Sequence, residues 1–506
     1  MNEPDNDPVW AFGPAGVSFG AGAGFLNMGE SLDPTDWPGF RAQGHRMLDD
    51  LLDHLQGLRE QPVWRPIPDR VRALRRTPLP ASPQPLADVH ESFLSEVLPY
   101  AGGNLHPGFM GWVQGAGTPV GMLADMLAAG LNANCGGRDH MPIEVEQEVA
   151  GWVRQMFGFP ETSVGLLVTG ASMANFIGVL AARQRVLGTG VRARGIAAGG
   201  DKLTAYVSLG AHNCVPRAME MAGLGRDALR MIPVDDDHRI DLSALRARLV
   251  ADLAAGLKPF LIVGNAGTVD TGAIDDLGGL ADIAAAEGCW LHIDGAYGAL
   301  GVLTPAVAPR LAGIERADSI AFDFHKWGQV PYDAGYILAR DGALLREVFA
   351  TDVQYLRREP RGLAAGDWWP CDYGPDLSRG FRALKVWFTL KVLGADAIGA
   401  SIARSCELGQ ALARMVTASP ALELLAPVQL NIVCFRYRCD APDLINTEIV
   451  ADLQEAGRVA PSLTRIGGQV AIRAALFNHR TDQSDVEALV RSCVALGDAA
   501  VRAGAA

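Results

Sequence analysis

Residues 319–327, with the sequence SIAFDFHKW, place a histidine and a lysine side by side at the end of an uncharged run. The run 319–322 is typical of a buried strand, and Asp323, His325 and Lys326 follow it. Because burial disfavours the ammonium form of a lysine, we expect the amine of Lys326 to act as a nucleophile that forms a Schiff base. A lysine after a strand is more often a solvated loop residue, so the assignment depends on other segments.

Asp294 ends a second apolar run, CWLHID at 289–294. A buried carboxylate beside a pyridine nitrogen keeps that nitrogen protonated by charge pairing. An aspartate that caps a turn gives the same local pattern. Thirty-two positions separate Asp294 from Lys326, which is enough for a strand, a helix and a second strand. Both side chains can therefore lie at the carboxyl edge of one parallel sheet, where ligands bind in open α/β folds.

Residues 169–172, TGAS, join an apolar run to a helical pattern at 173–183. Small residues at Gly170, Ala171 and Ser172 let backbone N–H groups reach a phosphate at a helix N-terminus. An ordinary serine N-cap has the same appearance.

Two further residues, His212 and Thr268, follow other apolar runs. The imidazole of His212 can lie over a cofactor ring, and Thr268 offers a hydroxyl near the same edge. Alone, the first is more often a packed or surface histidine and the second a turn residue. Pyridoxal phosphate needs an amine, a group that keeps its ring nitrogen protonated, a phosphate cradle and a ring clamp. Lys326, Asp294, residues 170–172, and His212 with Thr268 meet these needs in that order.

The elements that must position these residues alternate between 118 and 384. Strands separated by helices predict a doubly wound, mostly parallel sheet. After 384, a long helical pattern leads to strand-like runs of a smaller, antiparallel-type unit. The predicted strands of the large unit are 165–168, 203–208, 259–263, 290–293, 319–322 and 335–339, its helices include 242–253 and 277–286, and the later strand-like runs are 422–437 and 469–477.

We expect four parts in the chain. The first 30 residues form a loosely ordered, glycine-rich arm, and 31–117 form a helical N-terminal segment whose periodicity is clear over 31–76. Residues 118–384 form the large cofactor-binding α/β domain, and 385–506 form a small C-terminal α+β domain.

Composition excludes several classes of partner. The 506 residues carry a net charge of −13, which is unsuited to nucleic acid. The uncharged run 164–182 contains polar residues in its middle, so we expect no membrane span. The eight cysteines are scattered, and the spacing of Cys434 and Cys439 matches no metal site, so we expect reduced thiols and no metal. Residues 1–30 lack Lys and Arg, which argues against a targeting peptide and favours the cytoplasm.

Four motifs, TGASMAN at 169–175, AHNCV at 211–215, HIDGAYG at 292–298 and DFHKW at 323–327, occur in an order and spacing that resemble the group II pyridoxal-phosphate-dependent amino acid decarboxylases. That family includes the aromatic amino acid, glutamate, cysteine sulfinate and diaminobutyrate enzymes. The resemblance extends from about residue 32 to the end of the chain. It implies the fold of a type I pyridoxal-phosphate-dependent transferase, which resembles aspartate aminotransferase. Further matches are LDPTDWPGFRAQGHRMLDDL at 32–51, HPGFMGWV at 106–113 and SRGFRALKVWF at 378–388.

The resemblance assigns roles to single residues. Lys326 resembles the lysine that forms the Schiff base with the cofactor, and Asp294 resembles the partner of the pyridinium nitrogen. His212 resembles the histidine that stacks on the ring near the reacting carboxylate. The positions that match cofactor contacts are Gly170, Ala171, Ser172, Thr268, Ala296 and His325.

Residues 349–358, FATDVQYLRR, are similar to the mobile loop of the aromatic enzymes and place Tyr355 at the proton donor of the family. A general acid on a closing loop excludes water and decides where the proton goes. In the family this loop reaches the active site across a subunit interface. A homodimer with its active site at the interface is therefore implied, and 31–117 would be its dimerisation segment.

The residues expected at the substrate side chain give mixed indications. Aromatic members carry a Tyr-Phe-Pro run where this chain has Trp112, Val113 and Gln114. The segment around Asn134 resembles the glutamate branch instead. Amides bind carboxylates and hydroxyls, whereas Trp112 offers a face for stacking.

We therefore expect decarboxylation of an L-amino acid, aromatic or related, to its amine and carbon dioxide. The alternatives are a decarboxylase of an acidic or other polar amino acid and an aldehyde-forming oxidative member, against which the retained Tyr355 argues. A silent cofactor-binding dimer, or transaminase or carbon–carbon lyase chemistry on the same scaffold, are further alternatives.

Overall fold

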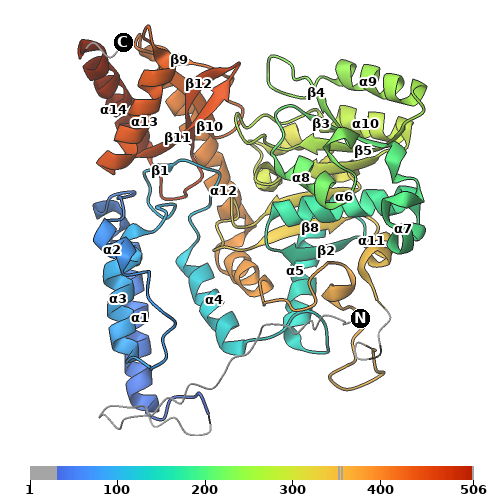
Figure 1. Cartoon of the computed structure of the whole chain (residues 1–506), viewed down its shortest axis with the longest axis horizontal. Coiled ribbons are helices and arrows are strands. Elements are labelled where there is room, and N and C mark those ends of the chain that lie inside the picture. Colours follow the sequence, from blue (N-terminus) through green and yellow to red (C-terminus); the bar gives the residue numbers. More distant parts are fainter. Residues whose placement is uncertain (1–30, 352–353, 355–356, 504–506) are drawn as a thin grey trace, which may run out of the picture. The chain divides into compact units, whose positions relative to one another are not determined.

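The computed structural model describes residues 31–351, 354 and 357–503 (Figure 1). The described chain divides into two compact units. The first contains the described residues up to Asp53 together with Ile67–Pro99, and the second contains His54–Pro66 and the residues from Tyr100 onward. The expected glycine-rich arm, 1–30, lies outside the described residues, so its conformation stays a prediction.

The helical pattern predicted over 31–76 is interrupted in the structure. Helix α1 (Trp37–Gln56) ends before Gly57, and only the short helix α2 (Asp69–Ala73) follows before α3 (Leu86–Glu96). Gly57 and the prolines at 62, 66 and 68 explain the break, because glycine favours a helix end and proline removes a backbone donor.

A sheet of seven strands forms the centre of the second unit, with the order β2-β8-β7-β6-β5-β3-β4. Strands β4, β3, β5, β6 and β7 run parallel, whereas β8 is antiparallel to both of its neighbours. The strands are β2 (Val164–Val168), β3 (Leu203–Ser208), β4 (Leu229–Ile232), β5 (Lys258–Asn265), β6 (Trp290–Asp294), β7 (Ser319–Asp323) and β8 (Gly335–Ala339).

Helices cover both faces of this sheet (Figure 1). Along β3, Ala205 and Val207 belong to one buried apolar cluster and Tyr206 to the other, because successive side chains of a strand point to opposite faces. The first face packs against α6 (Ala171–Leu187), α8 (Cys214–Met221) and α11 (Gly342–Phe349). The second packs against α5 (Met141–Phe157), α9 (Leu242–Ala254) and α10 (Leu277–Glu287).

The C-terminal part contains a second sheet of five strands, with the order β1-β11-β12-β10-β9. Its edge strand β1 (Phe109–Met110) comes from far earlier in the chain and pairs in parallel with β11 (Ala460–Ile466). The other strands are β9 (Leu422–Leu424), β10 (Ile432–Tyr437) and β12 (Gln469–Ala475); helices α13 (Pro442–Ala456) and α14 (Gln483–Arg502) pack on them.

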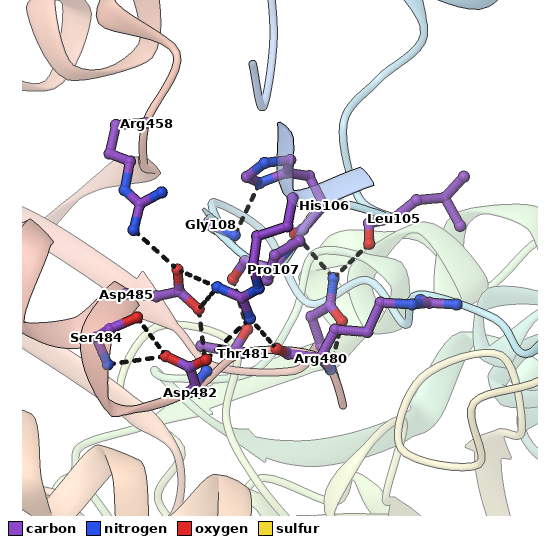
Figure 2. Close-up of polar contacts among 12 residues, drawn as sticks. Leu105, His106, Pro107, Gly108, Arg458, Arg480, Thr481, Asp482, Ser484 and Asp485 are labelled. Carbon is purple, nitrogen blue, oxygen red and sulfur yellow. Dashed lines mark hydrogen bonds and ion pairs between the residues drawn. The ribbon is translucent and has the colours of Figure 1, made fainter. Parts of the chain in front are cut away.

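A polar network anchors the segment before β1 to the start of α14 (Figure 2). The side-chain amide of Asn478 donates to the carbonyls of Asn104, Leu105 and His106, at 3.0, 3.0 and 2.8 Å. Thr481 Oγ1 donates to the carbonyl of Pro107 at 2.7 Å. These bonds fix the direction in which the chain enters β1 and the residues after it.

Two helices in the second unit connect the sheets. Helix α4 (Pro119–Leu131) precedes α5, and α12 (Ala383–Ala418) bends by 88° at Gly394, where φ is 80° and ψ is 155°. Among the described residues, no single helix is long and apolar enough to cross a membrane; only the two halves of α12 taken together pass that test.

The predicted fold class is confirmed: a large, mostly parallel sheet, a helical N-terminal segment and a C-terminal α+β part are present. Several details differ from the expected elements. Strands β1, β4 and β11 were not predicted, and the run 422–437 consists of two strands, β9 and β10. The boundaries proposed at 117/118 and 384/385 stay predictions.

Candidate active site

Five of the chemically suited segments meet in one cavity of about 420 Å³ at the carboxyl edge of the parallel strands. Residues 169–172 follow β2, His212 follows β3, Gly267 and Thr268 follow β5, Asp294 ends β6, and Lys326 follows β7. The parallel strands of an open α/β sheet end at one edge, and this explains why residues so far apart in sequence share a site.

Lys326 lines the cavity, with its Nζ 2.9 Å from Asp323 Oδ2. Burial, the largest single cause, would lower the pKa of this lysine, but the negative charges of Asp323 and Asp294 together outweigh it, and the pKa of Lys326 is raised. In the cofactor-free chain the ammonium form of Lys326 is therefore favoured, so burial alone does not free the amine; the Schiff-base role of Lys326 stays a prediction.

Asp294 is a buried carboxylate with only weak partners. Asp294 is 4% exposed, and its Oδ1 accepts a hydrogen bond from the backbone N–H of Ala296 at 3.1 Å. Cys214 Sγ lies 3.7 Å from Oδ2. No cation of the described chain lies within 4.0 Å of it, and burial raises the pKa of Asp294. A buried carboxylate in this state fits a positively charged ring nitrogen in the cavity.

A chain of buried polar side chains leads from Ser319 through His292, Asn175 and Cys214 to Asp294. His292 places Nδ1 2.7 Å from Ser319 Oγ and Nε2 2.7 Å from Asn175 Oδ1. The amide of Asn175 donates to Cys214 Sγ at 3.3 Å, and Cys214 contacts Asp294. Burial lowers the pKa of His292 to about 3, so its ring is neutral and serves as a fixed hydrogen-bonding group.

The proposed phosphate cradle is the start of α6. Gly170 packs so closely on β8 that a Cβ added to Gly335 would lie 2.3 Å from Gly170 Cα. The N–H of Ala171 donates to Asp323 Oδ1 at 2.6 Å, and Ser172 is exposed on the cavity wall. Within the described chain, no acceptor contacts the backbone N–H of Ser172.

The residues expected to contact the ring also lie on the cavity wall. His212 accepts from the N–H of Cys214 through Nδ1 at 3.2 Å, so Nε2 is the ring nitrogen left to donate a hydrogen bond. Thr268 Oγ1 lies 3.1 Å from Thr271 Oγ1. His325 Nδ1 accepts from the N–H of Ala334 at 3.0 Å, and burial lowers the pKa of His325.

Of the predicted substrate residues, Trp112, Val113 and Gln114 line the cavity and Asn134 does not. The amide oxygen of Asn134 accepts instead from the N–H groups of Gly136 and Arg379, each at 3.0 Å. Tyr355 lies outside the described residues, and its role stays a prediction.

Several lining residues were not singled out from the sequence. Arg473 on β12 is 3% exposed and donates to the carbonyls of Gly111 and Val269. A charged residue inside the apolar run QVAIRAALF was the signal that could have identified it. The Tyr332 ring lies 4.3 Å from that of His325. The remaining unpredicted lining residues are Cys214, Asn265, Val269, Tyr297 and Asp323.

These observations together fit pyridoxal phosphate. The cavity offers a lysine amine, a buried carboxylate that lacks a cation, and N–H groups at the start of a helix of 17 residues. Each corresponds to one part of the cofactor: the aldehyde, the ring nitrogen and the phosphate.

Comparisons with known proteins agree. The model of the pyridoxal-dependent decarboxylase conserved domain matches residues 68–438. An aromatic-L-amino-acid decarboxylase of Bacillus atrophaeus is 32% identical over 479 residues, which are 90% of this chain and 95% of the relative. A phenylacetaldehyde synthase of Arabidopsis thaliana is 27% identical and covers 91% of this chain and 96% of its own.

Solved structures share the fold. The glutamate decarboxylase domain of a Vibrio parahaemolyticus diaminobutyrate-pyruvate transaminase and L-2,4-diaminobutyrate decarboxylase superposes with a TM-score of 0.82 at 25% identity, over 92% of this chain and 97% of that one. Oryza sativa TDC, solved with PLP and tryptamine, gives a TM-score of 0.85 at 23% identity, over 92% and 99%.

Proposed function

The chain belongs to the pyridoxal-dependent decarboxylase family and is an amino acid decarboxylase that uses pyridoxal phosphate, and from this premise we propose that its substrate is an aromatic L-amino acid. The reaction removes the α-carboxylate as carbon dioxide and leaves the amine.

The observation that carries the choice of substrate is Trp112. Trp112 is 57% exposed and lines the cavity next to Val113 in the chain. Its ring offers an aromatic face on which a substrate ring could stack. The amide of Asn134 already binds two backbone N–H groups, so Gln114 is the remaining amide from the predicted pocket. This balance favours an aromatic side chain over an acidic one.

The cofactor supplies a protonated ring that withdraws the electron pair of the breaking bond. Lys326 would hold its aldehyde carbon, and the start of α6 with Ser172 would hold its phosphate. Asp294 would keep the proton on the ring nitrogen, because a buried carboxylate without a cation is stabilised by one.

The other residues orient the substrate and move protons. His212 would lie over the ring and direct the substrate carboxylate, with its Nε2–H as the available donor. Tyr355 would deliver the proton that replaces the carboxylate. Closing of its loop would exclude water at that step.

We further propose that the active enzyme is a homodimer located in the cytoplasm. Helix α1 has no buried residue within the chain, although Trp37, Phe40 and Met47 are apolar. An apolar helix surface of this kind is typical of a subunit interface. All eight cysteines are free thiols, which fits a reducing compartment.

The test is carbon dioxide release by the cofactor-loaded protein over aromatic, acidic, basic and small L-amino acids. We expect release from aromatic substrates, one amine per carbon dioxide, and none from the Lys326→Ala protein. Release from acidic amino acids alone would refute the substrate assignment. Peroxide and ammonia formed with the carbon dioxide would instead identify an aldehyde-forming enzyme, the activity named for the Arabidopsis relative.

A further inference from the structure

Asp323 lies between the two groups that would hold the cofactor, the start of α6 and Lys326. Asp323 is 2% exposed. Oδ1 accepts from the N–H of Ala171 at 2.6 Å, and Oδ2 lies 2.9 Å from Lys326 Nζ. Both contacts are short, and both use groups that the cofactor needs.

Lys326 is the main cation that balances the negative charge of Asp323. His325 Nε2 lies 3.6 Å from Oδ2, beyond hydrogen-bonding distance, and burial lowers the pKa of His325, which disfavours a cationic ring beside the carboxylate. Asp294, the other carboxylate of the cavity, adds negative charge. A phosphate at the start of α6 would therefore meet a carboxylate that already occupies its first N–H group.

We propose that Asp323 is a built-in competitor of the cofactor phosphate. Its carboxylate holds the Ala171 N–H and the Lys326 ammonium in the cofactor-free chain, and the phosphate must displace it from the helix start. Two anions in a poorly solvated site repel each other, so the carboxylate weakens binding of the phosphorylated cofactor. Asp323 is thus a positioning residue that sets how readily the enzyme gains and loses its cofactor.

This role can be separated from a general effect on Lys326. An Asp323→Asn change keeps an oxygen that accepts from Ala171 but removes the negative charge. Pyridoxal has the same aldehyde as pyridoxal phosphate but no phosphate, so it reports the effect on Lys326 alone. The ratio of the two dissociation constants isolates the competition at the helix start.

The experiment uses the full chain, freed of cofactor with hydroxylamine and dialysis, and titrated with pyridoxal phosphate and with pyridoxal while absorbance is followed. Asp276→Asn is the matched control, because Asp276 also accepts a helix-start N–H, at 2.9 Å, but lies outside the cavity. Asp323→Ser serves as a second neutral variant if the first does not fold. The thermal shift on adding pyridoxal phosphate gives an independent readout of affinity.

We expect the preference for pyridoxal phosphate over pyridoxal to rise tenfold or more in D323N and to stay unchanged in D276N. The thermal shift with pyridoxal phosphate should grow in parallel. An unchanged or reduced preference in D323N and D323S would overturn the proposal. Because catalysis is not measured, a wrong substrate assignment leaves this result intact.

Discussion

Asp294 and Asp323 are two buried carboxylates in one cavity, and their partners give them different tasks. Asp323 is paired with Lys326 at 2.9 Å, whereas Asp294 has a backbone N–H and a thiol. The carboxylate without a cation is the one suited to a cationic ring nitrogen. The paired one fixes the lysine in its charged form before the cofactor arrives.

Replacing Asp294 by Asn should leave the cofactor bound but slow catalysis by roughly 10³-fold, the size expected when an electrostatic contact to the reacting system is removed. The amide cannot hold the ring proton by charge pairing. Single-turnover release of carbon dioxide, with bound cofactor measured by absorbance, tests this. Asp276→Asn controls for the loss of one charge, and normal turnover in the Asp294 variant would contradict the role.

At this scale the sequence predicted which residues meet but not how they are paired. The motifs placed Lys326, Asp294 and His212 in one site because each follows a strand of the same sheet. The pairing of Lys326 with Asp323 depends on side-chain rotamers, which spacing does not determine. The rotamer of Asn134, which turns its amide oxygen toward the backbone N–H of Gly136, is likewise not determined by spacing in the sequence.

Among the elements, the contact between α6 and β8 is the one that most directly shapes the cofactor site. Gly335 begins β8, and Gly170 precedes α6. Because β8 is antiparallel to its neighbours, its first residue lies at the edge where the other strands end. Backbone meets backbone there, without room for a side chain.

A Gly335→Ala change should therefore displace the start of α6 and weaken cofactor binding. We expect a loss of about 1–3 kcal/mol in the free energy of unfolding, as for other overpacked sites. Denaturant unfolding and a titration with pyridoxal phosphate measure the two effects. Gly130→Ala in α4 is the control, since nothing lies within 4 Å of the added Cβ; equal effects of both changes would contradict the prediction.

Element prediction succeeded for the buried apolar strands of the large sheet and missed β1, β4 and β11, which are short or carry charged and polar residues. The buried strands β5, β6 and β7 were identified from continuous apolar runs. Edge strand β4 has four residues, among them Arg230, and gives no such run. Arg473 reaches the cavity from the second sheet; a charged residue within the apolar run 469–477 indicates a buried charge but not the cavity that it lines.

For the whole molecule, the apolar side chains of α1 bear on the number of subunits. Trp37 and Phe40 are 57% and 46% exposed within one chain. A Trp37→Ser, Phe40→Ser double variant should shift a dimer toward monomer, because the interface would lose apolar area. Sedimentation at several protein concentrations measures this, with Arg41→Ser as the control on the same helix. A wild-type monomer would refute the dimer.

Two histidines with lowered pKa values, the buried His292 and the partly buried His479, should make the molecule sensitive to acid. Burial lowers the pKa of His292 to about 3 and of His479 to about 4. Below about pH 6.5 the unfolded chain binds protons that the folded chain does not, so stability falls as the pH drops toward 4.

Each histidine contributes a slope of up to about 1.4 kcal/mol per pH unit. Denaturant midpoints between pH 7 and 4.5 should therefore decline less steeply in His479→Asn than in the wild-type protein. Parallel curves for the two proteins would show that His479 does not titrate on unfolding.

The edge strand β1 has a consequence for how specificity can change. Trp112, Val113 and Gln114 follow this strand, and Arg473 comes from β12 of the same sheet, whereas the cofactor groups follow or end strands of the large sheet. If these residues contact the substrate as proposed, changes among the few positions after β1 would alter the choice of amino acid and leave the cofactor groups in place.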